Sequence, residues 1–201
     1  MFKKGDADAD FSEIVKDPRG RLLIFNENFK DRKSLDKSEG TTAVVRPYAT
    51  DPRKPRCAVG VITGWTSGAG GGFRTFAKDS DEQVCVDLSL DRVWLVARHV
   101  GAEQILFSAE PNGKSTRPVL GFGIFASSIC DPAKDHINQG IRDLPNRGER
   151  RGLHRKTIQD IEAEEAKLQA KLQARRDGGG SDREVRFAQG GFLLSLNPRT
   201  L

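Results

Sequence analysis

A run of ten residues from Gly64 to Phe73 has the composition of a loop that binds an anion. It reads Gly-Trp-Thr-Ser-Gly-Ala-Gly-Gly-Gly-Phe. Because glycine lacks a Cβ atom, such a loop can turn its backbone amides toward a phosphate at close range. It fits neither the P-loop nor the dinucleotide-binding fingerprint, since Phe73 stands where a lysine or a third glycine is required. The sequence therefore predicts a phosphate-binding loop of no standard class, with a purely flexible loop as the equal alternative.

A second group of polar residues follows an apolar run near the N-terminus. Asn26 and Asn28 come directly after the predicted strand from Arg21 to Phe25. In open α/β sheets, ligands bind outside the carboxyl ends of the strands. Asparagine is also a common turn residue, and an ordinary turn is the favoured interpretation of this pair.

Neither metal chemistry nor covalent catalysis has a recognisable set of residues. The three histidines lie far apart and the three cysteines are never within CxxC distance. We therefore expect reduced thiols in a cytoplasmic protein, with no metal and no cofactor. Ser67 lacks the Gly-x-Ser-x-Gly context of a nucleophile elbow. The candidate acids and bases, each more often a solvated loop residue, are Glu27, Glu110 and Asp131.

The elements predicted around these residues alternate between strands and helices. Ser80 is a helix cap followed by two acidic residues, and apolar side chains then recur at three- and four-residue steps until Gly101. The dipole of this helix could add to the phosphate site. Apolar runs over residues 104–108 and 119–126 predict strands, and Asp131-Pro132 begins another helix that ends near Leu144. We predict an α/β domain of three layers with a mixed, mostly parallel sheet.

The order of segments over residues 82–144 resembles the macrodomain family, which binds ADP-ribose. The resemblance rests on a helix that leads into Gln104-Ile105-Leu106-Phe107, on Gly121-Phe122-Gly123-Ile124-Phe125, and on the helix that opens at Asp131-Pro132-Ala133. It implies that the second of these segments holds the diphosphate or the distal ribose. It also places the loop after the first strand and the glycine-rich loop near the ligand. The residues that the resemblance assigns to a second phosphate loop are Gly121, Gly123, Ile124 and Phe125.

The first functional hypothesis is a module that binds a nucleotide such as ADP-ribose through glycine-containing loops. Trp65, Phe73 or Phe125 could stack on the base. If the protein is an enzyme, we expect a hydrolase of ADP-ribosyl or related phosphate-containing substrates, with no catalytic residue assigned. The candidate ligand-binding residues are Asn26, Asn28, Gly68, Gly70, Gly71, Gly72, Phe73, Gly121, Gly123, Ile124 and Phe125.

The chain divides into five segments by composition. We predict a flexible leader over residues 1–16, the domain over 17–144, a basic linker over 145–155, an amphipathic helix over 156–176, and a glycine hinge with a docking tail over 177–201. The helix carries apolar residues at heptad spacing, with Glu165 interrupting the seam. Packing back on the domain, or pairing with a partner helix, is as much expected as self-association. The seam residues are Ile158, Ile161, Leu168 and Leu172.

Two alternative functions follow from these outer segments. In one, the helix and tail bind neighbouring chains, making a homo- or hetero-oligomer for which the domain is a scaffold. In the other, the linker binds nucleic acid, which is not favoured because 33 basic residues stand against 28 acidic ones over the whole chain. No apolar run approaches the ~20 residues that span a bilayer, so no membrane partner is expected. The arginines of the second alternative are Arg147, Arg150, Arg151 and Arg155.

Overall fold

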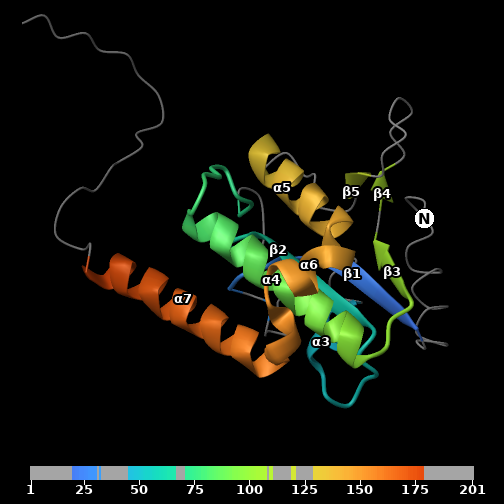
Figure 1. Ribbon diagram of the computed structural model, residues 1–201. Coiled ribbons are helices and arrows are strands. Elements are labelled where there is room, and N and C mark those ends of the chain that lie inside the picture. The colour runs from blue at the N-terminus through green and yellow to red at the C-terminus, as the bar shows by residue number, and fades with distance from the viewer. Residues whose placement is uncertain are drawn as a thin grey trace, which may run out of the picture.

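A three-stranded parallel sheet forms the centre of the molecule (Figure 1). The computed structural model describes residues 20–30, 32, 45–66, 71–107, 109–110, 119–120 and 129–178. The strands are β1 (Arg21–Asn28), β2 (Ala58–Gly64) and β3 (Gln104–Phe107), in the order β2-β1-β3. Phe25 of β1 lies opposite Gly60 of β2, and Leu23 lies opposite Leu106 of β3. The α/β class predicted from the sequence is confirmed.

Alternate residues of β1 feed two separate apolar clusters. Leu22 and Ile24 pack under the long helix α4 (Asp81–His99), whereas Leu23 and Phe25 pack on the opposite face with the short helix α3 (Pro47–Thr50). All of β2 is buried, as is typical of a parallel strand covered on both faces. Both faces of the sheet therefore carry apolar contacts.

Helix α4 begins and ends where the sequence predicted. The Ser80 hydroxyl accepts a hydrogen bond from the backbone N–H of Gln83, and Gly101 adopts a left-handed conformation with φ of 64°. Two side chains of α4 also bond to the outer edge of β2. The backbone N–H of Ile62 donates to the Ser89 hydroxyl at 3.2 Å, and Arg92 Nη2 donates to the carbonyl of Gly60 at 3.1 Å.

The segment predicted as a basic linker is helical. Helix α5 (Asp131–Arg142) is followed by α6 (Leu144–Arg150) and a 3-10 turn, η1 (Leu153–Arg155). Pro145 lies in the first turn of α6, where its missing N–H costs no helical hydrogen bond. Gly148 of α6 lies so close to Trp94 of α4 that an added Cβ would be 2.0 Å from the indole ring. The segment is therefore packed against the domain.

Helix α7 (Ile158–Gly178) packs back on the domain alongside α4 (Figure 1). Thr157 and Asp160 cap its first turn reciprocally, because each backbone N–H donates to the other residue's side chain. Ile161 and Leu168 of the predicted seam are buried, and so is Glu165 between them. Of the three arrangements left open by the sequence, the structure shows packing within the chain.

The second apolar run near residue 119 does not extend the parallel sheet in its described part. Strand β5 (Val119–Leu120) pairs antiparallel with β4 (Ala109–Glu110) in a separate two-stranded sheet. The predicted leader and tail, and the second phosphate loop over residues 121–125, lie outside the described residues. In the part of the chain that the structure describes, no helix is long and apolar enough to cross a membrane.

Candidate functional site

A cleft of about 750 Å³ lies where β1 and β2 reach their carboxyl ends. The loops after these strands form one wall, and the start of α4 and the second half of α7 form the other. This is the edge at which open α/β sheets bind ligands. The residues that line it, called here the strand-end cleft, are Phe29, Lys30, Trp65, Thr66, Gly71, Asp81, Glu82, Gln169, Leu172, Gln173 and Arg175.

Three aromatic rings support the wall of the strand-end cleft. The Trp65 ring meets the rings of Phe29 and Phe73 edge-on, with centroid distances of 5.7 and 5.1 Å. Phe73 is only 1% exposed, so its ring belongs to the core and cannot stack on a ligand as the sequence suggested. Trp65 is half-buried and lines the cleft, so its position is fixed by the two rings behind it.

Close backbone contacts determine the base of the glycine-rich loop. The backbone N–H of Trp65 donates to the carbonyl of Gly71 at 2.7 Å, and Gly64 pairs with Gly72 in an isolated bridge. A Cβ added to Gly71 would lie 1.9 Å from the carbonyl oxygen of Thr66. Gly71 is therefore required for the loop to close, and it also lines the cleft. Gly68 and Gly70 lie outside the described residues.

The N-terminus of α4 is already occupied by protein groups. Ser80 caps its first turn. The Asp81 carboxylate accepts a hydrogen bond from Lys171 Nζ at 2.9 Å and also forms an ion pair with Arg175. Hydrogen bonding from Lys171 is the main cause that lowers the pKa of Asp81 below its ordinary value. The contribution of this helix dipole to a phosphate site stays a prediction. The same contacts join α7 to α4 at one end of the cleft.

The two candidate asparagines stand beside the cleft rather than in it. Asn26 and Asn28 are half-buried on β1, and neither lines the described cavities. The backbone N–H of Asn28 donates to Glu27 Oε1 at 2.8 Å. Of the predicted ligand residues, the structure thus places Gly71 in the cleft. It places Gly72 at the base of the loop and Phe73 in the core.

A second cavity, of about 330 Å³, lies along the outer edge of β2 between α3 and α7. We call it the arginine pocket, because the basic side chains that line it are Arg32, Arg56 and Arg92. Its acidic residues are Glu27 of β1 and two glutamates of α7, Glu162 and Glu165. The pocket shares no lining residue with the strand-end cleft, and the ring of Phe29, which lines the cleft, lies 4.6 Å from the Arg32 guanidinium.

Two buried ion-pair groups border the arginine pocket. Arg46 holds the Glu27 carboxylate through Nε at 2.9 Å and also through Nη2, with both side chains almost fully buried. Gly60 makes room for Glu27, since an added Cβ there would lie 2.6 Å from the Glu27 Cβ. Glu165 lies 3.2 Å from Arg32 and 3.1 Å from Arg92. Such paired burial keeps each charge compensated in a low dielectric.

Sequence reasoning missed these charged partners, although it contained a signal for them. Glu27 follows an apolar strand, Arg92 lies within an apolar helix face, and Glu165 interrupts a heptad seam. A charged residue at a position whose spacing predicts burial needs an opposite charge. Its partner cannot be read locally, because Arg92 and Glu165 are 73 residues apart in the chain.

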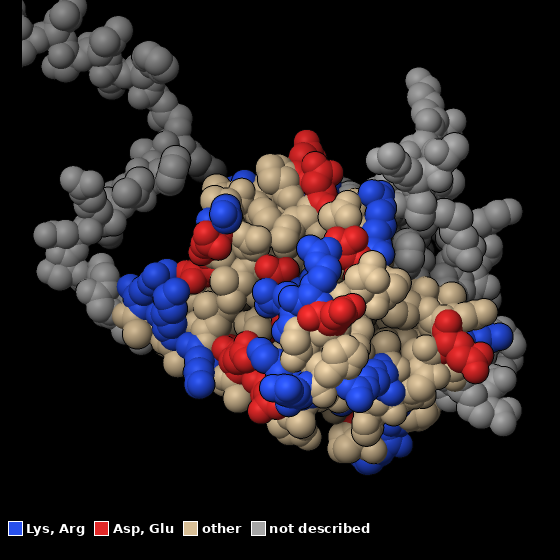
Figure 2. Space-filling model, in the orientation of Figure 1, with Lys and Arg blue, Asp and Glu red and all other residues tan. Residues whose placement is uncertain are grey.

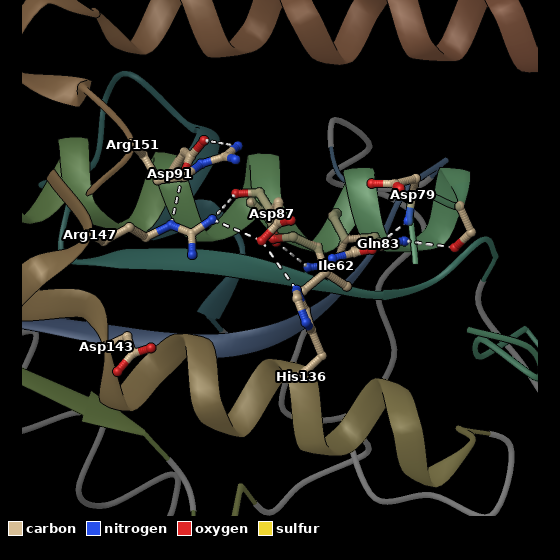
Figure 3. A network of polar contacts seen from close by, with 12 residues as sticks. Ile62, Asp79, Gln83, Asp87, Asp91, His136, Asp143, Arg147 and Arg151 are labelled. Atoms are coloured by element: carbon tan, nitrogen blue, oxygen red, sulfur yellow. Dashed lines mark hydrogen bonds and ion pairs between the residues drawn. The ribbon is translucent and has the colours of Figure 1, made fainter. Parts of the chain in front are cut away.

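A polar network joins α4, α5 and α6 and includes two of the four arginines of the predicted linker (Figure 3). Arg147 donates to Asp91 at 2.7 Å and to Asp87 at 3.1 Å, and Arg151 donates to Asp91 at 3.0 Å. Burial raises the pKa of Asp87, but hydrogen bonds from His136 and Arg147 outweigh it, so the pKa lies below the ordinary value. This cluster is explained by helix packing.

The basic surface expected for nucleic-acid binding is thus largely neutralised. Arg150 also has a carboxylate partner, Asp143, at 2.9 Å. On the face shown in Figure 2, basic and acidic side chains are interspersed over the helices. Counterion release requires clustered cations, and nucleic-acid binding by these arginines stays a prediction.

All three cysteines are free, and Cys57 and Cys85 are buried whereas Cys130 is half-buried. Burial raises the pKa of Cys57 to about 11 and also raises the pKa of Cys85. Thiols in this state are poor nucleophiles. Among the described residues, no group of histidine, cysteine and acidic side chains could hold a metal ion.

Comparison of the chain with protein-family models, curated proteins and solved structures returned no match. The function is therefore argued from the residues themselves.

Proposed function

We propose that this protein is a small-molecule-binding α/β module whose ligand is a nucleotide, with ADP-ribose as the leading candidate. The observation that carries the proposal is the position of the strand-end cleft at the carboxyl ends of two neighbouring parallel strands. Its volume of about 750 Å³ is in the range of small-molecule sites. A nucleotide combines an aromatic base with phosphate, and both parts have a counterpart in the cleft.

Trp65 supplies the surface for the base. Its ring is half-buried and is held from behind by Phe29 and Phe73, so stacking would cost little ordering of the indole. Lys30 and Gly71 line the cleft and are the groups proposed to meet the phosphate. The proposal concerns binding alone and assigns no catalytic residue.

Intrinsic fluorescence tests the proposal, because the chain has two tryptophans, Trp65 and Trp94. Trp94 packs against His154 and Gly148 and does not line the cleft, so it is the matched control. In a Trp94→Phe variant, ADP-ribose should change the emission of Trp65 in a saturable way. ADP, NAD and a short oligonucleotide are titrated in parallel to define the ligand class.

The Trp65→Phe variant distinguishes local binding from a global effect. Its remaining indole, Trp94, should show no saturable change with the same ligands. No saturable change in the Trp94→Phe variant with any nucleotide would refute the proposal, as would equal changes in both variants. A response to the oligonucleotide alone would favour the nucleic-acid alternative instead.

Assembly through the C-terminal helix stays a prediction with less support. Ile161 and Leu168 of its seam are buried within the chain, so these two side chains are not available to a partner helix. The tail that was expected to dock on neighbouring chains lies outside the described residues.

A further inference from the structure

A basic side chain of α7, Arg175, lines the strand-end cleft and is held by a residue of α4. Arg175 forms an ion pair with Asp81, which also lines the cleft and lies in the first turn of α4. The same carboxylate accepts a hydrogen bond from Lys171 Nζ at 2.9 Å, and Lys171 lies one turn before Arg175 on α7. Two cations of α7 therefore share one carboxylate, so one of them is in excess.

The two cations differ in their relation to the cleft. Arg175 is one of the lining residues, whereas Lys171 is not. The Arg175 side chain is 61% exposed, and an ion pair with a partner this exposed contributes little to stability. Arg175 can therefore leave Asp81 at small cost. Asp81 does not become unpaired when this happens, because it keeps the hydrogen bond from Lys171.

The charges around the cleft favour one further anion. Lys30 and Arg175 are its basic lining residues, and Asp81 and Glu82 are its acidic ones. When Lys171 is counted beside Asp81, three cations stand against two carboxylates. A guanidinium can donate two parallel hydrogen bonds to a phosphate group, which makes arginine the better of the two α7 cations for this contact.

We propose that Arg175 is a phosphate-binding residue of the strand-end cleft, and that the Asp81 carboxylate competes with the phosphate of the ligand for its guanidinium. The inference rests on the proposed function, because the phosphate belongs to the nucleotide whose base stacks on Trp65. Lys30 and Gly71 meet this phosphate from the strand side of the cleft, and Arg175 meets it from the helix side. Helix α7 is then part of the binding site.

Two substitutions that break the same ion pair have opposite expected effects. Arg175→Met removes the proposed phosphate contact, so ADP should bind about tenfold more weakly. Asp81→Asn removes the competing carboxylate, so ADP should bind about two- to fivefold more tightly, which is the factor that corresponds to an exposed ion pair. If the pair served only to hold α7 against α4, both substitutions would loosen the cleft and both would weaken binding.

The affinities are measured by titrating the full-length Trp94→Phe protein with ADP and ADP-ribose at constant ionic strength and following the emission of Trp65. Lys167→Met is the matched control, because Lys167 is an exposed cation of the same helix and lines none of the described cavities. This control should leave both affinities unchanged. A loss equal to that of Arg175→Met would show that the net charge of α7 governs binding, and it would overturn the inference.

The outcomes separate this inference from the proposed function. A lower affinity in Arg175→Met together with a higher affinity in Asp81→Asn supports the inference. Any other combination, with the nucleotides still bound by the Trp94→Phe protein, would overturn it and leave the nucleotide proposal standing. No saturable binding of ADP or ADP-ribose to the Trp94→Phe protein would refute the nucleotide proposal and this inference with it.

Discussion

At the scale of single residues, each buried charged side chain in the described part of the chain has a partner of opposite charge. Glu27 and Arg46 lie 19 residues apart in the chain, and both oxygens of the Glu27 carboxylate pair with the Arg46 guanidinium. The buried pair is not itself strong evidence for stability, because removing two charges from water has a large cost. Its importance appears when one partner is lost.

Arg46→Met should therefore be strongly destabilising. It leaves the Glu27 carboxylate buried without a charge partner, which typically costs about 3–5 kcal/mol of the free energy of unfolding. Urea denaturation followed by circular dichroism measures the change. Arg53→Met, which breaks an exposed pair with Asp51, should have little effect. Similar midpoints for the two variants would show that Glu27 finds another partner or is solvated.

Residue-scale signals also mark the limit of prediction from the sequence. The cap at Ser80 and the left-handed stop at Gly101 were predicted because each acts through neighbours within one helical turn. The aromatic support of Trp65 and the pairing of Arg92 with Glu165 depend on contacts between distant segments. Phe73 was assigned to the ligand from its place at the end of the glycine-rich loop. Its burial depends on packing against Trp65, which a single sequence does not display.

At the scale of elements, α7 is the helix that closes both cavities. Glu162 and Glu165 in its first half line the arginine pocket, and Gln169, Leu172 and Gln173 in its second half line the strand-end cleft. Its buried positions follow the heptad spacing of the sequence, but the spacing alone could not say whether the apolar side faces this chain or another. The buried Glu165 explains the interruption, since its partners are arginines of the domain.

Leu168→Ala should loosen α7 from the domain. Leu168 is 7% exposed in the main apolar cluster, and truncating a buried leucine costs about 2–5 kcal/mol. Hydrogen exchange should accelerate in α7 more than in β1 and β2, which lie in the centre of the fold. Lys167→Ala is the control, because Lys167 is at an exposed position of α7 and both residues are good helix formers. Equal acceleration in all elements would indicate that α7 unfolds together with the sheet.

At the scale of the whole molecule, the thiols report how completely the described fold excludes solvent. Cys57 and Cys85 are buried, whereas Cys130 at the start of α5 is half-buried. Thiolate formation at Cys57 is further suppressed, because burial raises its pKa to about 11.

A thiol reagent such as Ellman's reagent should therefore modify one cysteine rapidly in the native protein and all three after denaturation. A Cys130→Ser variant should lose the fast phase, because its remaining thiols are protected by packing. Absorbance at the released chromophore gives the stoichiometry and the rates. Fast modification of all three thiols under native conditions would show that the core opens readily.

The contacts from α4 to the outer edge of β2 have a consequence for how the protein behaves in a crowded solution. An edge strand with free N–H and C=O groups is a template on which another chain can add a strand, and such pairing leads to aggregation. Here the outward carbonyl of Gly60 and the outward N–H of Ile62 are taken by Arg92 and Ser89. A guanidinium and a hydroxyl from the same helix thus block β-addition at these two groups, so the fully buried strand β2 is also shielded from intermolecular pairing along this stretch.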